Sequence, residues 1–185
     1  MSVQSAAPAA VEADPKSWKE FFSESGRFRI TFPGNPVESD NSFGPASGRK
    51  FTLTTTASYF AGYHDMSTSE AAEFEQHVEL RKQLFDKLRD ETRAAIQQKT
   101  KINLIEEADI SIDGYPGRSI KIRLENGDVV RNHSYLVGTR IYQIFVVTPK
   151  ESLAKDGGKF DEMRAAKFLN SFRLAEKLRH DGLED

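Results

Sequence analysis

The sequence predicts an α+β protein in which an antiparallel β-sheet is flanked by one long helix and one short helix. Residues 110–148 alternate between segments rich in β-branched and aromatic residues and glycine-containing breakers, as expected for a β-meander. Residues 69–98 contain neither glycine nor proline and carry apolar residues at helical spacing. Residues 159–170 repeat the helical pattern over a shorter length. Strands and helices in this order favour an antiparallel sheet over a doubly wound one.

The N-terminal third predicts two strands. Residues 27–32 alternate cleanly, so that Phe28, Ile30 and Phe32 point inward, and the prolines that follow stop the strand. Residues 38–48 are expected to form a polar loop and residues 49–59 a second strand. The three aromatic residues within 18–22 are expected to pack against the core, because a solvated segment would avoid them.

The long helix is expected to follow a connection at 61–68 and to begin at a capping box formed by Ser67 and Glu70. At a rise of 1.5 Å per residue its length would be about 45 Å. The meander then starts near residue 101. After it come a polar loop at 151–158, the short helix, and a closing segment at 171–174, giving the order ββ–α–ββββ–α.

The Asn-Gly turn at 126–127 leaves two sheet registers open. With a two-residue turn, Ile122 faces Arg131, and Arg131 and His133 interrupt an otherwise apolar face. With a three-residue loop and a glycine bulge, Ile122 faces Val130, and Arg131 and His133 point to the opposite face. A two-residue turn at 138–139 pairs Tyr135 with Tyr142 in either case.

Composition predicts a soluble chain with one domain at 18–174, preceded by a flexible leader at 1–17 and followed by a charged tail at 175–185. With 185 residues, 38% of them hydrophobic, the chain can bury a true core. The net charge of -2 provides no basic field for nucleic acid, and the absence of cysteine excludes disulfides and thiolate sites. No apolar run reaches the roughly 20 residues of a membrane-spanning helix. The segment 1–17 has no signal-peptide pattern, which predicts a cytoplasmic protein as written. The alternative is an exported, periplasmic protein whose signal peptide was removed.

Several motifs at strand starts and turns recur in a known group of proteins. They are Trp18 with Phe21-Phe22, Gly26 to Ile30 leading to Phe32-Pro33-Gly34-Asn35-Pro36, Gly114 to Arg118, Tyr135 to Gln143, and Phe168 to Phe172. Together these motifs resemble bacterial proteins of uncharacterised function that share the PsbP-like α/β/α sandwich. This fold is also seen in extrinsic photosystem proteins and in a small Ran-binding nuclear import factor. The resemblance extends over nearly all of 18–174 and implies the fold, but it brings no catalytic set.

The sequence predicts no catalytic residue, no metal ligand and no cofactor, and therefore no enzyme. Serine-hydrolase and phosphate-cradle motifs are absent. The four histidines, His64, His77, His133 and His180, form no metal-binding pattern. Glu73 and His77 stand four residues apart on the long helix, a spacing that can share a metal, but a solvated helix face is the favoured reading.

The candidate binding residues are Arg131, His133, Tyr135 and Tyr142, which together could form an anion-binding or partner-binding surface on the sheet. The favoured alternative is structural: Arg131 pairs with a helix carboxylate and the tyrosines cap the core. The leading hypothesis for function is a non-catalytic binding or accessory domain with an unknown protein partner. A small-ligand carrier, with a cavity between the sheet and the long helix near the two tyrosines, ranks second, and an unrecognised enzyme ranks last.

Overall fold

The structure is a computed structural model that describes residues 18–40, 48–96, 102–153 and 158–175. The predicted leader at 1–17 and the predicted tail from residue 176 onward lie outside the described residues. So do residues 41–47, which belong to the predicted polar loop at 38–48.

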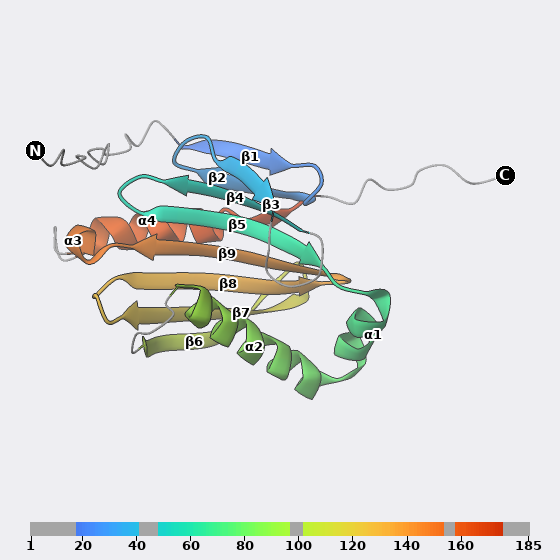
Figure 1. Ribbon diagram of the computed structural model, residues 1–185. Coiled ribbons are helices and arrows are strands. Elements are labelled where there is room, and N and C mark those ends of the chain that lie inside the picture. Colours follow the sequence, from blue (N-terminus) through green and yellow to red (C-terminus); the bar gives the residue numbers. More distant parts are fainter. Residues whose placement is uncertain (1–17, 41–47, 97–101, 154–157, 176–185) are drawn as a thin grey trace, which may run out of the picture.

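A seven-stranded antiparallel sheet forms the centre of the fold, with strand order β3-β4-β5-β9-β8-β7-β6 (Figure 1). A second sheet, β1-β2-β10, has three strands, and its central strand pairs with one strand from each end of the domain. The large sheet contains β3 (Val37–Asp40), β4 (Gly48–Thr54), β5 (Ser58–Asp65), β6 (Ile102–Ile112), β7 (Tyr115–Leu124), β8 (Val129–Val137) and β9 (Arg140–Thr148); the small sheet contains β1 (Lys19–Ser23), β2 (Phe28–Phe32) and β10 (Arg173–Leu174).

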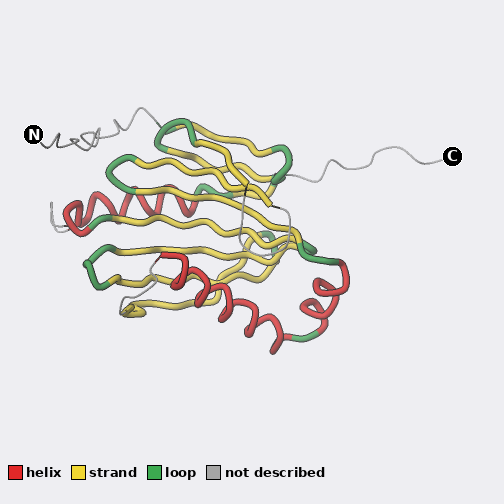
Figure 2. Tube along the Cα trace, viewed as in Figure 1, coloured by secondary structure: helices red, strands yellow, loops and turns green. Residues whose placement is uncertain are grey.

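The elements stack in three layers. Neighbouring residues of β9 point to opposite faces of the sheet, and each face has its own cover. Ile141 packs against Phe85 and Leu88 of helix α2 (Val78–Ile96), whereas Tyr142 packs against Phe172, which follows helix α4 (Lys159–Asn170). Figures 1 and 2 show α2 crossing one face while α4 and the small sheet cover the other. The expected α+β sandwich is confirmed.

The main core lies between the large sheet and the layer formed by α4 and the small sheet, and it is rich in aromatic rings. Phe28 of β2 contacts the rings of Phe51, Tyr142 and Phe172 at centroid distances of 5.4 to 6.0 Å. Phe21 of β1 lies 4.7 Å from Phe51. The expectation that the aromatic residues within 18–22 pack on the core is therefore confirmed for Trp18 and Phe21, whereas Phe22 is half exposed.

The predicted long helix is in fact two helices, α1 (Thr68–Gln76) and α2. The capping box of Ser67 and Glu70 is present at the start of α1. His77 interrupts the helix because its backbone is extended, with φ -121° and ψ 102°. Arg81, in the first turn of α2, donates a hydrogen bond of 2.9 Å to the carbonyl oxygen of Phe74, which stabilises the break. The break lets each helix bury its own apolar side chains, among them Ala71 and Phe85.

The predicted single strand at 49–59 is also wrong, because the chain reverses within it. β4 ends at Thr54 and β5 begins at Ser58, joined by a tight turn in which Thr55 N–H donates to the Ala57 carbonyl at 2.8 Å. β5 then continues through most of the predicted connection at 61–68, and the predicted loop at 38–48 starts as edge strand β3. The predicted loop at 151–158 begins as the short helix α3 (Lys150–Leu153).

The meander follows the glycine-bulge register at its Asn-Gly turn. Ile122 pairs with Val130, and Lys121 pairs with Arg131. Gly127 has φ 92°, a left-handed conformation that favours glycine. At the next turn, Tyr135 pairs with Tyr142, as both alternatives expected. This register turns Arg131 and His133 away from α2 and toward α4.

Candidate functional site

A half-open pocket of about 280 Å³ lies between α4 and strands β6, β7 and β8. Its polar lining comes from three strands and one helix, whereas Ile120, Ala166 and Leu169 form its apolar part. The polar residues are Glu106, Ser119, Lys121, Arg131, His133, Glu162 and Asn170. Strand alternation explains this set, because residues 119, 121, 131 and 133 share the sheet face that α4 covers.

A buried arginine and a partly exposed glutamate form the charged centre of the pocket. The Arg131 side chain is 9% exposed, and it donates from Nε to Glu162 Oε2 at 3.1 Å and from Nη2 to Glu162 Oε1. Its Nη1 donates to the Thr148 hydroxyl at 3.4 Å. Lys121 Nζ also donates to Glu162 Oε1, at 2.9 Å. Glu162, in the first turn of α4, thus neutralises two cations while its own side chain stays 50% exposed.

The protonation states in the pocket follow from these contacts. Burial alone raises the pKa of the Glu162 carboxyl, but hydrogen bonds from Arg131 and Lys121 outweigh it, so that the pKa lies below its usual value. Burial lowers the pKa of His133 to about 4, because the charged imidazolium loses its hydration. His133 is therefore neutral near pH 7. Its Nδ1 lies 3.4 Å from the Tyr135 hydroxyl.

The structure divides the four predicted site residues. Arg131 and His133 line the pocket, and Arg131 pairs with a helix carboxylate as the structural alternative expected. Tyr135 reaches the pocket only through His133, and its ring stacks on Phe172 at 5.7 Å. Tyr142 belongs to the core. Its hydroxyl donates to the carbonyl of Gly26 at 2.7 Å, which ties the turn before β2 to the large sheet.

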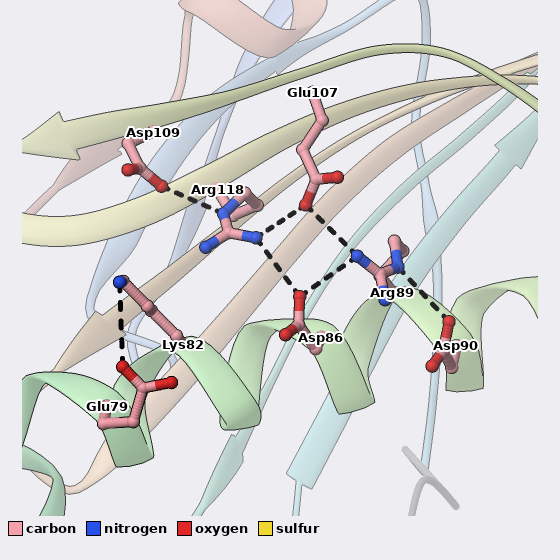
Figure 3. A network of polar contacts seen from close by, with 8 residues as sticks. All are labelled: Glu79, Lys82, Asp86, Arg89, Asp90, Glu107, Asp109 and Arg118. Carbon is pink, nitrogen blue, oxygen red and sulfur yellow. Dashed lines mark hydrogen bonds and ion pairs between the residues drawn. The ribbon is translucent and has the colours of Figure 1, made fainter.

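The expected location of a ligand cavity must be corrected. Tyr135 and Tyr142 face α4 and the small sheet, so a cavity beside them cannot lie against the long helix. The interface of α2 with the sheet is instead occupied by apolar contacts and by an ion-pair network (Figure 3). In that network Arg118 of β7 donates to Glu107 at 2.6 Å and to Asp86 of α2 at 3.4 Å. These contacts hold α2 against β6 and β7.

Sequence reasoning missed three pocket residues, Glu162, Ser119 and Asn170. Lys121 was expected beside Arg131 in the glycine-bulge register, but it was not named as a site residue. Lys121 lies between Ile120 and Ile122 in an alternating strand, a pattern that ordinarily places a lysine in solvent. Glu162 stands in the first turn of a predicted helix, where an acidic residue is explained by the helix dipole alone. Only the glycine-bulge register, combined with the position of α4, brings these charges together.

The remaining histidines do not form a second site. His64 is half buried on the α2 face, and burial lowers its pKa. His77 ends helix α1, and His180 lies outside the described residues. Across the part of the chain that the structure describes, no cluster of three or more potential metal ligands occurs. Among the same residues, no helix combines the length and the apolar character needed to span a membrane.

Comparisons with known proteins identify the fold. No family model and no curated protein matches the sequence. Among solved structures, the cyanobacterial PsbP protein (CyanoP) from Synechocystis sp. aligns over 93% of this chain and 98% of its own, with a TM-score of 0.53 and 10% sequence identity. PA94, a Pseudomonas aeruginosa protein of unknown function, aligns over 80% of this chain and 94% of its own, with a TM-score of 0.39 and 12% identity.

The first of these likenesses, together with the layers described above, defines the class of protein. This is an α+β sandwich built on an antiparallel sheet. More specifically, the chain has the PsbP-like fold, as the motifs in the sequence implied. At 10% identity the likeness concerns the fold alone.

Proposed function

We propose that this chain is a non-catalytic binding domain, and that the pocket between α4 and the sheet binds a carboxylate group of a ligand or partner. The observation that carries this proposal is the unequal burial of one ion pair. Arg131 is fixed and covered, whereas its counter-ion Glu162 is half exposed at the mouth of the pocket. The pair with Glu162 shows that Arg131 binds a carboxylate in this position.

The proposed event is an exchange of carboxylates. A carboxylate that enters the pocket can take over the paired hydrogen bonds from Nε and Nη2 of Arg131, a geometry that suits the guanidinium group. Glu162 is then released to water, where its charge is well solvated. Lys121, with a side chain 27% exposed, stays within reach of either carboxylate. After the exchange, Arg131 again has a carboxylate as its counter-ion.

The remaining lining limits the size and character of the ligand. At about 280 Å³ the pocket is slightly smaller than most small-molecule sites, so that it suits a short organic acid or a single acidic group. Ser119, Asn170 and the neutral His133 offer hydrogen bonds without further charge. Leu169 and Ala166 offer an apolar contact for a short carbon chain.

Binding is favoured over catalysis by the state of the serine–histidine pair in this pocket. Ser119 and His133 are direct cross-strand neighbours and both line the pocket. A general base works best when its pKa is near the working pH, and burial lowers that of His133 to about 4. The Nδ1 atom of His133 faces the Tyr135 hydroxyl, whereas a serine-activating histidine is oriented by a carboxylate.

Titration calorimetry with succinate tests the proposal, with succinamide as the uncharged control ligand. The Glu162→Gln variant, which lacks the internal competitor, is expected to bind succinate about tenfold more tightly than the wild type, a gain of about 1.4 kcal/mol. Arg131→Met is expected to abolish binding. Glu151→Gln, which removes the same charge from an exposed position on α3, should match the wild type.

Thermal unfolding provides a second readout. Glu162→Gln leaves the buried guanidinium without its carboxylate and should be destabilised. A bound ligand at 100 times its dissociation constant restores about 2.7 kcal/mol, so that succinate should raise the melting temperature of this variant more than that of the wild type. Equal succinate affinity in Glu162→Gln and Glu151→Gln, or equal binding of succinamide, would overturn the exchange.

A further inference from the structure

We infer that the free edge of β6 is a docking site for an extended, lysine- or arginine-containing segment of a partner protein, which adds to the large sheet as a further strand. This surface adjoins the pocket at Arg131 through Glu106, which lines that pocket, but it uses the backbone edge of β6 and does not involve Arg131. The inference rests on three features of β6: an outer backbone edge that pairs with no other described strand, its exposed side chains and the charge around it.

The backbone of β6 offers a long template for strand addition. β6 ends the strand order of the large sheet and pairs only with β7 among the described strands. A bulge interrupts the pairing between Leu104 and Glu106, but from Glu106 to Ile112 the pairing is unbroken. Along an edge strand, alternate N–H and C=O groups point away from the sheet and can bond to another strand. β6 has no proline and no lysine, the residues that commonly protect such edges.

Most side chains of β6 between Asn103 and Ser111 are exposed to solvent, whereas Ile110 and Ile112 pack against the main core. Leu104 and Ile105 are large apolar residues that are nearly half exposed at the bulge. Glu106, Ala108 and Asp109 are exposed beyond it. Exposed aliphatic groups beside an unpaired edge suit a partner strand that carries aliphatic side chains of its own.

The charge around this edge selects a basic partner. Figure 3 shows two arginines, Arg89 and Arg118, surrounded by four carboxylates at the contact between α2 and β6–β7: Asp86, Asp90, Glu107 and Asp109. The two arginines and Glu107 are largely covered, whereas Asp86, Asp90 and Asp109 are more exposed. The contrast is largest for Arg118 and its partner Asp109, whose side chains are 13% and 84% exposed. Solvent therefore meets negative charge on this face of β6, and Glu106 adds another carboxylate on the opposite face.

The same charges disfavour pairing between two copies of this chain. An antiparallel β6–β6 contact would bring Glu106, Glu107 and Asp109 of one copy against the same residues of the other. Like charges across a strand pair are destabilising. The opposite edge of the sheet differs from β6, because β3 has only four residues and its Glu38 and Asp40 are both paired with Arg49, which is half exposed. Strand addition is therefore expected at β6 and not at β3.

NMR spectroscopy of the full chain tests this inference, with a short synthetic peptide in which lysine alternates with valine as the probe. Amide shift changes and slowed amide hydrogen exchange are expected to cluster in β6. Glu106→Lys should weaken peptide binding about tenfold, since it replaces an attraction with a repulsion. The matched variant Glu38→Lys, on the β3 edge, should bind as the wild type does. The melting temperature of each variant confirms that it is folded.

Three results would overturn the inference. One is a set of shift changes centred on β3 or scattered over every acidic surface, which indicates nonspecific attraction of a cationic peptide. Another is equal binding of a control peptide in which glutamate replaces lysine, or of one interrupted by proline, since neither can combine charge pairing with strand addition. The third is the absence of binding by the lysine–valine peptide.

Discussion

Replacement of Arg131 by alanine tests whether the charged centre of the pocket also stabilises the fold. The side chain is covered by α4 and connects three elements, since it bonds to Glu162 of α4 and to Thr148 of β9 from its own strand β8. Alanine removes both the guanidinium and the aliphatic stem that fills the space beneath α4. The partners respond differently, because Glu162 is half exposed whereas Thr148 is 1% exposed.

The magnitude follows from that difference. Glu162 keeps Lys121 and gains water, so the loss of its arginine costs little. The buried Thr148 hydroxyl loses its donor, which costs about 1–3 kcal/mol. The lost stem adds about 0.8 kcal/mol for each methylene that was covered. Relief from desolvation of the guanidinium group offsets part of this total. We expect Arg131→Ala to lower the free energy of unfolding by about 2–3 kcal/mol.

Urea unfolding followed by circular dichroism measures this change. Arg131→Met retains most of the apolar stem and should lose about 1 kcal/mol less than alanine does. Arg49→Ala is the matched control: its side chain is 49% exposed and pairs with Glu38 and Asp40 on β3, so its loss should stay within about 0.5 kcal/mol. If Arg131→Ala unfolds at the same urea concentration as Arg49→Ala, the reasoning from burial is refuted.

Two further predictions concern the other candidate residues. The pKa of His133 is about 4 in the folded chain and 6.5 in its ordinary state, so the unfolded chain takes up a proton first as pH falls. The neutral His133 therefore contributes its full share to the free energy of unfolding above pH 6.5. That contribution declines by up to about 3 kcal/mol as the pH falls toward 4. In urea unfolding, the free energy of unfolding of His133→Gln should therefore fall less steeply with decreasing pH than that of the wild type. An unchanged pH dependence would contradict the burial of His133. Tyr142→Phe should cost about 1 kcal/mol, because it leaves the Gly26 carbonyl without a buried donor, whereas Tyr135→Phe removes only a long contact and should cost less. Equal losses in thermal unfolding would argue against the role given to the Tyr142 hydroxyl.

The meander and the short helix could be predicted because their signals are local. Glycine occupies left-handed positions at Gly114, Gly127 and Gly138, and each marks a reversal. The hairpin between β4 and β5 carries no such mark, since its turn is made of threonine and alanine. The break between α1 and α2 at His77 also has no signal in the sequence, because no glycine or proline occurs there. Packing against the sheet overrides helix propensity at this point.

The candidate site could be predicted only in part. Arg131 and His133 were identified because polar residues interrupt an apolar strand. Their direction stayed open, because both possible turns place an Asn-Gly pair at the reversal and both require a left-handed glycine. Glu162 was missed because its meeting with Arg131 depends on how α4 sits on the sheet. Phe168, packed against Phe32 and Tyr59, sets that position through contacts remote in sequence.

The order of strands has a consequence for how this chain matures during synthesis. β5 pairs with β4 and with β9, and the β9 partner comes much later in the chain, since Ser58 pairs with Val147. In the same way, β2 pairs with β1 and with the late strand β10. On a ribosome, the first half of the domain therefore emerges with β5 unpaired on one side and with Phe28 and Phe32 lacking Phe172 and Phe168. Domains generally fold as units, and strand edges that are still unpaired during synthesis are prone to aggregate. The domain thus cannot close until nearly its last residue has left the exit tunnel, and a chain truncated before β10 would present an open aromatic core to the chaperones of its cell.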